Sequence, residues 1–297
     1  MIHQPLHVLP EVATQLELPA PKRIELCQKD VWIPYTRAAV ILDELKALVA
    51  HPSSIRMPNV LIVGRAANGK SSLLERFARL HPLGMRPNGT PDMPIVRIVM
   101  PQTPKEGNFW SAILWALNVG HRDRDPPERK QSQVMEMLAF IGARVLVIDE
   151  LNHLANAAKE AGRVLAAMKN LSTVLRISIV AAGTHAAVNA LRSDEQLLTR
   201  FRAQPLDRWA LDKEYLRLLA SYEQLLPLAQ PSNLASRELA PMIYARAGDV
   251  LGGTVSVLRR AACRAIECGK ERIDAPILES LGTTRYGSDW EDALNRS

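Results

Sequence analysis

The chain has 297 residues, 47% of them hydrophobic and 23% charged, which excludes disordered and fibrous proteins. No apolar run is long enough to cross a bilayer, and the first residues lack the pattern of a secretion signal. The three cysteines show neither disulfide nor metal-ligand spacing, so we expect a cytoplasmic protein without a membrane segment. A net charge of +6 permits binding to a polyanion such as DNA but does not establish it.

The N-terminal part of the chain, residues 1–35, is predicted to form an arm, because its first twenty residues contain three prolines and little helical periodicity. Apolar residues then recur at helical spacing over residues 36–50. Short apolar runs rich in branched residues follow and are typical of strands buried on both faces. They cover residues 59–63, 95–100, 144–148 and 176–182.

Amphipathic stretches of helical length alternate with these runs, at residues 71–80, 108–118, 131–142 and 157–174. Alternating strands and helices predict an α/β fold, a parallel sheet sandwiched by helices, over residues 36–209. The strand signals then stop. Helices predicted at 211–226, 236–246 and 254–267 indicate a small all-α lid domain over residues 210–285, with a tail at 286–297.

A glycine-rich segment with a lysine follows the first predicted strand directly. It matches G-x-x-x-x-G-K-[ST], in which backbone N–H groups at the start of a helix point at phosphate oxygens. Lys70 is expected to reach the β- and γ-phosphates, and the Ser71 hydroxyl to bind magnesium. A chance match is expected in about one chain in a hundred of this length, which favours a phosphate loop over a chance turn. The predicted nucleotide site comprises Gly64, Arg65, Ala66, Ala67, Asn68, Gly69, Lys70, Ser71 and Ser72.

The apolar run at residues 144–148 is followed by two carboxylates, Asp149 and Glu150. We expect this strand to lie beside the first, so that its carboxyl end faces the nucleotide. Asp149 would hold magnesium through water, and Glu150 would orient and polarise the attacking water. Either residue alone would suit a helix cap, but the pair downstream of a phosphate loop favours catalysis. The chain lacks the guanine-specificity motif Asn-Lys-x-Asp, which favours ATP over GTP.

Polar residues further along the chain are candidates for contacts with the nucleotide. Thr184 follows the fourth predicted strand, where its side chain would touch the γ-phosphate or the attacking water, unless the segment is only a turn. Arg200 or Arg202, before the last core strand, would reach the ATP of a neighbouring subunit, unless both lie on a solvated helix end. Arg200 is favoured over Arg202. In the lid, Arg259 or Arg260 would fold back onto the nucleotide or lie on the surface.

These motifs resemble the AAA+ ATPases and, more narrowly, the transposition regulators that include TniB, TnsC and MuB. Four features carry the resemblance: Asp30-Val31-Trp32-Ile33-Pro34-Tyr35 ahead of a helix, Arg56-Met57-Pro58-Asn59 before the first strand, the Asn-Gly-Lys-Ser form of the phosphate loop, and Gly-Thr after the fourth strand. The likeness to TniB runs over residues 22–266. One departure is that AAA+ proteins carry the lid arginine close after a glycine, whereas Arg259 lies six residues beyond Gly253.

The resemblance implies that ATP drives this protein to oligomerise on double-stranded DNA, without sequence preference, as a ring or helical filament. It would mark a target site, recruit or activate a transposase, and work with a target-selection protein of the TniQ type, while hydrolysis clears it from unsuitable DNA. For DNA contacts the family suggests Thr103 and Lys105, in the segment after the second strand. Residues 121–124 are a second candidate, and Trp32 and Tyr35 would flank the adenine or belong to the core.

Three other functions fit parts of the sequence. A related DNA-linked ATPase, such as a helicase loader or an insertion-sequence helper, would differ only in its protein partner. A signalling ATPase would use the same nucleotide site without binding DNA. A metabolic phosphotransferase is disfavoured, because a hydrolytic glutamate such as Glu150 would waste ATP in such an enzyme.

Overall fold

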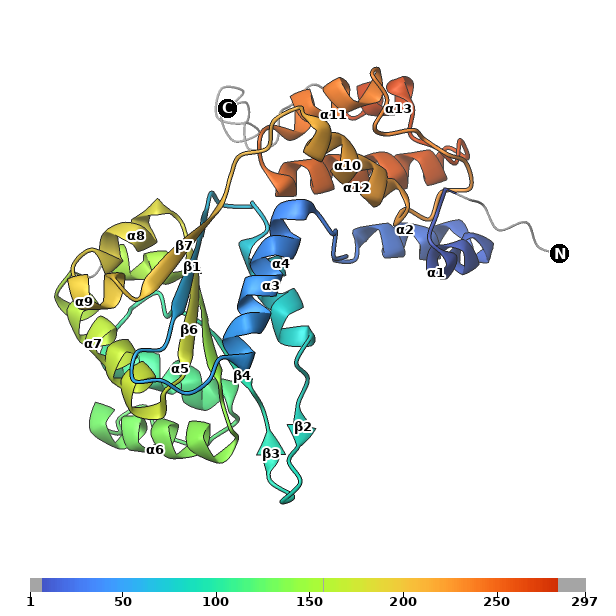
Figure 1. Cartoon of the computed structure of the whole chain (residues 1–297). Helices are drawn as coiled ribbons and strands as arrows, with labels where there is room; N and C mark the ends of the chain where they lie inside the picture. Colours follow the sequence, from blue (N-terminus) through green and yellow to red (C-terminus); the bar gives the residue numbers. More distant parts are fainter. Residues whose placement is uncertain (1–6, 157, 283–297) are drawn as a thin grey trace. The chain divides into compact units, whose positions relative to one another are not determined.

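The computed structural model describes residues 7–156 and 158–282 (Figure 1), so the predicted tail lies outside the described residues. The chain divides into two compact units. One is the continuous stretch Arg37–Asp207, which we call the α/β unit. The other, the helical unit, combines the chain on both sides of that stretch.

The N-terminal segment, for which an arm over residues 1–35 is predicted, groups with the C-terminal helices in the helical unit. Cys27 and Ile33 are buried in the same hydrophobic core as Tyr215 and Leu219. This apolar contact joins parts of the chain that are far apart in the sequence, and local periodicity carries no signal of it.

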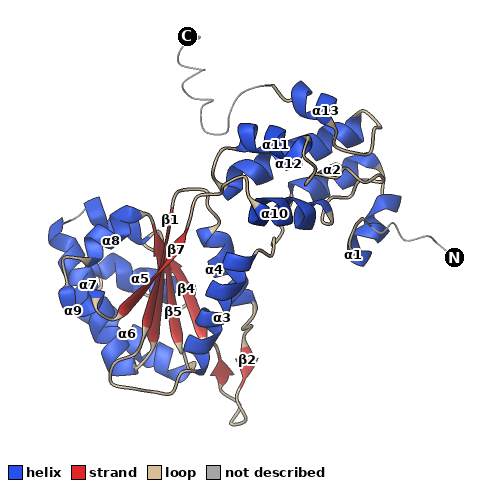
Figure 2. Cartoon of the chain, turned by 45° about the horizontal axis from the view of Figure 1, so that its top comes forward, coloured by secondary structure: helices blue, strands red, loops and turns tan. Residues whose placement is uncertain are grey.

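A five-stranded parallel sheet forms the centre of the α/β unit (Figure 2). Strands β1, β5 and β6 are buried at every position, as expected of apolar runs covered on both faces. The predicted fold class is therefore confirmed. In spatial order the strands are β4 (Ile95–Val99), β5 (Val145–Asp149), β6 (Ser178–Gly183), β1 (Asn59–Gly64) and β7 (Phe201–Leu206).

Strand β5 does not lie beside β1, and the expectation that it would is wrong. Strand β6 separates them: Val180 pairs with Val60 of β1, and Ile179 pairs with Leu146 of β5. All six residues of β6 are buried, which suits a central position in the sheet. Because the strands are parallel, the carboxyl ends of β1 and β5 still meet at the same edge.

Helices cover both faces of the sheet (Figures 1 and 2). The helices on one face come directly before and after β1 in the chain. The helices on the other face connect β4, β5, β6 and β7. The first group is α3 (Thr36–Ala50) and α4 (Lys70–Arg79), and the second contains α5 (Glu106–Ala116), α6 (Pro127–Phe140), α7 (Ala158–Leu175) and α8 (His185–Leu191). The short helix η2 (Leu151–Asn156) follows β5, and the short helix α9 (Glu195–Leu198) precedes β7.

Two further parts complete the described chain. A small antiparallel hairpin of β2 (Gly84–Met85) and β3 (Pro91–Asp92) lies between α4 and β4 in the sequence and was not predicted. The helical unit contains α1 (Pro10–Ala13), η1 (Thr14–Glu17), α2 (Ala20–Gln28), α10 (Lys213–Glu223), α11 (Leu239–Ala247), α12 (Leu251–Glu267) and α13 (Ala275–Ser280). Within the described ranges, none of the helices combines the length and the apolar character of a membrane span.

Candidate functional site

The predicted phosphate loop is a tight turn between the carboxyl end of β1 and the first residue of α4. Gly69, just before α4, has a φ of 83°, and Ala67 has a φ of 57°, so both are in the left-handed region. At Gly64 a Cβ atom would lie 3.0 Å from Leu206 Cβ, so the loop begins in close contact with the end of β7. Such a strand–turn–helix backbone is suited to binding anions.

Lys70 is the first residue of α4 and its side chain is buried. Its Nζ donates hydrogen bonds to the carbonyl oxygens of Gly64, at 3.0 Å, and Arg65, at 2.7 Å. Burial lowers the pKa of Lys70, while the charges of Glu150 and Asp149 act in the opposite direction. The structure therefore brings the lysine of the loop and the two carboxylates at the end of β5, Asp149 and Glu150, within electrostatic range of one another.

The remaining loop residues differ in exposure. Arg65 and Ala66 are exposed in the turn, and Ser71 and Ser72 are exposed in the first turn of α4. Asn68 is 3% exposed and is directed away from solvent. The hydroxyl that the pattern assigns to magnesium therefore lies on the accessible side of the loop, one residue beyond the buried ammonium.

Asp149 is the last residue of β5, with only 2% of its surface exposed. Its Oδ1 accepts a hydrogen bond from the backbone N–H of Glu150 at 2.9 Å, and its Oδ2 lies 3.5 Å from Nη2 of Arg97. Glu150 has a φ of 55°, a left-handed conformation that is uncommon for a non-glycine residue. The sharp change of backbone direction at Glu150 separates its half-buried side chain from the strand core.

Asn152 connects Glu150 to the end of β6. Its Nδ2 donates to Glu150 Oε2 at 3.1 Å, and its Oδ1 accepts from the backbone N–H of Thr184 at 3.3 Å. Gly183 makes this approach possible, because a Cβ atom there would lie 2.6 Å from Ala187 Cβ and 3.1 Å from Asn152 Oδ1. The structure thus brings Thr184 into one network with the predicted catalytic glutamate.

Sequence reasoning missed Arg97 and Asn152 at this edge, and for Asn68, which it placed in the nucleotide site, it gave no partner for the side chain. Arg97 forms ion pairs with both Glu75 and Asp149 from inside β4. An arginine within an otherwise apolar strand is a signal that could have been noticed. The two asparagines have no such signal, because their partners are set by the tertiary structure.

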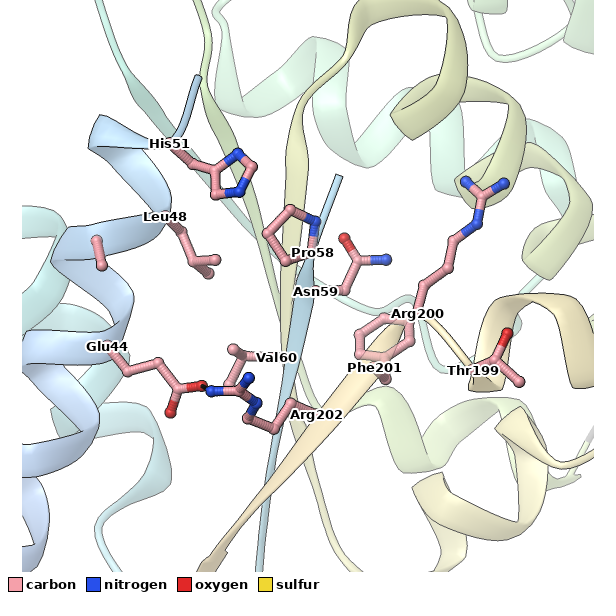
Figure 3. A pocket seen from close by; sticks show the side chains of 11 residues that line it. Glu44, Leu48, His51, Pro58, Asn59, Val60, Thr199, Arg200, Phe201 and Arg202 are labelled. Atoms are coloured by element: carbon pink, nitrogen blue, oxygen red, sulfur yellow. Dashed lines mark hydrogen bonds and ion pairs between the residues drawn. The ribbon is translucent and has the colours of Figure 1, made fainter. Parts of the chain in front are cut away.

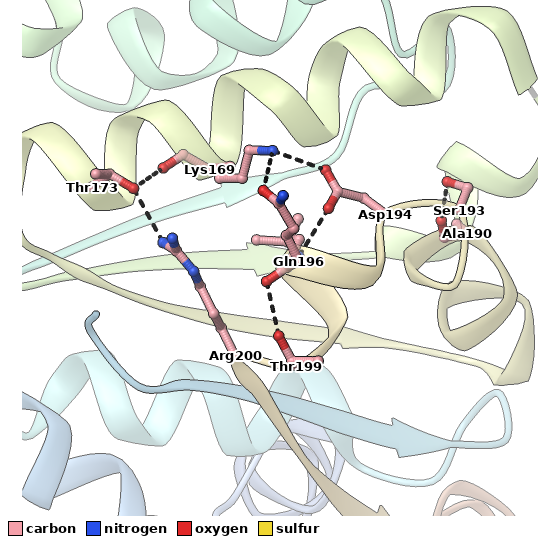
Figure 4. A network of polar contacts seen from close by, with 9 residues as sticks. Lys169, Thr173, Ala190, Ser193, Asp194, Gln196, Thr199 and Arg200 are labelled. Atoms are coloured by element: carbon pink, nitrogen blue, oxygen red, sulfur yellow. Dashed lines mark hydrogen bonds and ion pairs between the residues drawn. The ribbon is translucent and has the colours of Figure 1, made fainter. Parts of the chain in front are cut away.

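The two candidate arginines lie at the opposite, amino end of the sheet, where they line a pocket (Figure 3). Arg200 Nη1 donates to Thr173 Oγ1 of α7 at 3.1 Å (Figure 4), and Arg202 Nη1 lies 3.2 Å from Glu44 Oε1. Arg202 was expected before the last strand but is its second residue, paired with Val60. Neither side chain is brought to the phosphate loop of its own chain.

The candidate DNA-binding loop lies at the same edge as the phosphate loop. Thr103 and Lys105 are exposed between β4 and α5, and the backbone N–H of Lys105 donates to the Thr103 carbonyl at 2.9 Å. At the start of this loop, the N–H of Met100 donates to the Asp149 carbonyl at 2.8 Å. The other candidate segment, residues 121–124, lies between α5 and α6.

The lid candidate has partners within the helical unit. Arg259 Nη2 donates to the carbonyl of Lys29 at 2.7 Å and to Asp30 Oδ1 at 2.9 Å. Tyr35 packs edge-on against Trp209 with ring centroids 5.2 Å apart, so its ring belongs to an aromatic cluster of this unit.

Several solved structures have a similar fold, although their sequence identity to this chain is low. The Aeropyrum pernix ORC2 protein, in ADPNP–ADP complexes, is 15% identical with a TM-score of 0.62, over 86% of this chain and 70% of that one. The A. pernix ORC1 protein in complex with DNA is 13% identical with a TM-score of 0.55, over 86% and 68%. Cdc6p from Pyrobaculum aerophilum is 18% identical with a TM-score of 0.56, over 84% and 67%. No curated protein matches the chain.

Residues 23–211 match the sequence model of a family described as the bacterial TniB protein. The matched stretch is more than half of the chain and contains every strand of the five-stranded sheet, the phosphate loop, and both Asp149 and Glu150. The fold of the similar structures, a parallel sheet with C-terminal helices, is that of the AAA+ ATPases. The chain therefore has this fold and belongs to the bacterial TniB family, as its motifs indicated.

Proposed function

We propose that this protein is a cytoplasmic, magnesium-dependent ATPase that hydrolyses ATP at the carboxyl edge of its sheet. The observation that carries the proposal is the convergence of Lys70, Asp149 and Glu150 beside a loop suited to phosphate. The buried ammonium of Lys70 supplies positive charge where the β- and γ-phosphates carry negative charge. The same ammonium would stabilise the charge that develops on the β–γ bridging oxygen of the leaving ADP during hydrolysis.

Ser71 and Asp149 are the residues that would hold magnesium. Hydroxyl and carboxylate oxygens suit this hard cation, which often uses one or two carboxylates together with phosphate oxygens and water. Asp149 fits this role because it is buried and because its Oδ2 has only a long contact, 3.5 Å, with Arg97. Bound magnesium neutralises phosphate charge.

Glu150 is proposed as the general base. Asn152 holds one carboxylate oxygen, Oε2, so the other can accept the proton of a water molecule. The water oxygen forms a bond to the γ-phosphorus while the bond to the β–γ bridging oxygen breaks, and the proton passes to Glu150. Thr184, held by the same asparagine, would touch the γ-phosphate or the attacking water.

Two contacts are proposed to depend on assembly or on the lid. Arg200, or else Arg202, would act on the ATP of a neighbouring subunit, because both lie at the end of the sheet opposite their own phosphate loop. Arg259 would report the nucleotide from the lid, for which it must exchange its contacts with Lys29 and Asp30.

Membership of the TniB family supports a role in transposition. In this proposal ATP drives assembly on duplex DNA as a ring or filament, and the assembly recruits or activates a transposase together with a target-selection protein of the TniQ type. Hydrolysis then drives disassembly. The solved complex of the similar ORC1 protein with DNA supports DNA as a ligand, and the exposed Thr103 and Lys105 are the proposed phosphate contacts.

Sedimentation of the purified protein tests the proposal. We expect large nucleoprotein assemblies only when duplex DNA and a slowly hydrolysed ATP analogue are both present, and small species with ADP. Raising the salt concentration should dissolve the assemblies, since binding rests on phosphate contacts. Nucleotide binding without any response to DNA would replace this proposal with a signalling ATPase.

The partner distinguishes transposition from helicase loading. The assembled protein is mixed with a transposase and, in a parallel reaction, with a replicative helicase. We expect stimulation of DNA strand transfer by the transposase and no loading of the helicase onto DNA. The reverse result would assign the protein to the helicase loaders.

A further inference from the structure

Asn68 ties the phosphate loop to the end of β7. Both protons of its Nδ2 amino group are donated, one to the carbonyl oxygen of Leu206 at 2.9 Å and one to that of Asp207 at 2.8 Å. Gly64, at the other end of the loop, touches the same segment: a Cβ atom there would lie 3.2 Å from the Leu206 oxygen. Two residues of the loop, Gly64 and Asn68, therefore contact Leu206, the last residue of β7.

The segment that the loop contacts, Leu206 and Asp207, is the end of the α/β unit. Asp207 is the last residue of that unit, and Arg208 is the first residue of the returning chain in the helical unit. The next two residues contact Asp249 of the helical unit. The N–H of Trp209 donates to the carbonyl of Asp249 at 3.0 Å, and Arg208 Nη1 lies 3.4 Å from Asp249 Oδ2. Asp207, which Asn68 contacts, and Arg208, which Asp249 contacts, are consecutive residues.

We propose that Asn68 is a positioning residue that couples the phosphate loop to this junction. The proposal rests on the proposed binding of ATP. Phosphate in the loop orders its backbone, and an ordered loop holds the Asn68 amide firmly on the two carbonyl oxygens. The end of the α/β unit, Leu206 and Asp207, is thereby held when nucleotide is bound and released when it leaves.

The amide is chemically specific for this task. Two carbonyl acceptors require two donors from one short side chain, which asparagine supplies. Aspartate has nearly the same shape, but its ionised carboxylate only accepts, and it would face two carbonyl oxygens. Serine supplies a single donor, and alanine supplies none.

Limited digestion with trypsin after Arg208 measures the coupling. Arg208 is well suited because its side chain is 68% exposed. In the wild-type protein we expect a saturating ATP analogue to slow this cleavage by about fivefold or more, since each hydrogen bond to Asp207 and Leu206 opposes opening of the segment. In Asn68→Ala the cleavage is expected to be fast with and without the analogue.

The nucleotide affinity of each variant is measured first, so that every digestion is run at saturation. Asn68→Asp is expected to behave like Asn68→Ala, and Asn68→Ser to keep part of the protection. Asn170→Ala, an exposed asparagine replacement on α7, is the matched control and should behave like the wild type. Thermal unfolding without nucleotide checks that the variants are folded. If Asn68→Ala does not fold, the comparison is made with Asn68→Ser.

The outcomes separate this inference from the proposed function. If the folded Asn68 variants bind the analogue and show the full wild-type protection of Arg208, Asn68 does not couple the loop to the junction, while the proposed ATPase stands. If the wild-type protein fails to bind the analogue at all, the proposed function falls and the coupling falls with it.

Discussion

The two units of this chain use their buried charges in different ways. In the α/β unit, Lys70 and Asp149 are buried at the carboxyl edge of the sheet, where Lys70 donates to loop carbonyls, and Asp149 accepts from the backbone N–H of Glu150 and forms a long ion pair, 3.5 Å, with Arg97. In the helical unit, Arg23 and Glu271 form a closed pair: both guanidinium Nη atoms donate to the two carboxylate oxygens at 2.6 Å.

The pKa values express this difference. Burial lowers the pKa of Lys70, because the loop carbonyls and the two nearby carboxylates do not fully replace water. The hydrogen bond from Arg23, in contrast, lowers the pKa of Glu271, because the partner stabilises the ionised form. A poorly compensated charge can gain energy from a ligand, whereas a charge already paired with an opposite charge contributes to the stability of the fold. The comparison predicts that charge removal costs function in one unit and stability in the other.

The largest effect is expected for Lys70→Ala. Without the ammonium, binding of ATP should weaken by at least about 100-fold, and assembly on DNA should be lost. Because the buried charge is poorly compensated, the free energy of unfolding should not fall. Nucleotide binding, sedimentation and denaturant unfolding measure the three quantities. Lys46→Ala, which removes an exposed lysine of α3, is the control. Strong destabilisation by Lys70→Ala would contradict the comparison.

Glu150→Gln is expected to lower the hydrolysis rate by about 100-fold or more while ATP binding persists. Glutamine can still accept from Asn152 but cannot take a proton from water. The assembled state should then remain on DNA, which sedimentation with ATP detects. Glu136→Gln, at an exposed position of α6, should leave hydrolysis unchanged. Unchanged hydrolysis and disassembly in Glu150→Gln would remove Glu150 from the catalytic role.

At the amino end of the sheet, Arg200→Ala is expected to reduce hydrolysis by the assembled protein by about 100-fold without weakening ATP binding. Arg202→Ala should have a smaller effect, and Arg192→Ala, on the exposed end of α8, none. Mixing Arg200→Ala with Glu150→Gln subunits should restore part of the activity, because one variant keeps the catalytic site and the other keeps the arginine. Failure of the mixture to recover activity would show that Arg200 does not act between subunits.

In the helical unit, Glu271→Gln is expected to lower the free energy of unfolding by about 2 kcal/mol at neutral pH. Because the folded pKa of Glu271 is depressed, the ion pair contributes above the unfolded pKa of about 4.3 and is lost as the pH falls through the lower folded value. The difference from the wild type should therefore shrink in acid. Glu267→Gln, in an exposed pair with Arg264, should change stability by about 0.5 kcal/mol or less. A pH-independent difference would contradict the assignment.

How much of the fold could be predicted depends on whether an element has a local sequence pattern. Strands β1, β5 and β6 are continuous apolar runs, and their identity is local information. Strand β7 contains Arg202, Gln204 and Pro205 and pairs only with β1 at the edge of the sheet, so it lacks that pattern. The central place of β6 and the membership of Arg23 in the helical unit depend on long-range contacts that no local pattern contains.

The candidate site was predictable where its residues have a fixed spacing. Lys70, Asp149 and Glu150 follow from the phosphate-loop pattern and from carboxylates at the end of an apolar strand. Asn68 and Asn152 were not predictable in their roles, because the contacts of their side chains with Leu206 and Thr184 arise only when strands far apart in sequence come together. Sequence spacing thus finds the groups proposed to carry the chemistry and misses the partners of the side chains that contact the loop and the strand ends.

The smallest expected effect belongs to the DNA loop and tests whether both ligands meet at one edge of the sheet. Lys105→Ala should weaken DNA binding only a few-fold but reduce the slope of log affinity against log salt by about one, because one phosphate contact is lost. Binding measured over a range of salt concentrations reveals this change, and Lys46→Ala is again the control. If Arg122→Ala and Arg124→Ala reduce the slope and Lys105→Ala does not, DNA lies beside residues 121–124. The carboxyl edge would then serve ATP alone, and its poorly compensated charges would be explained by a single ligand.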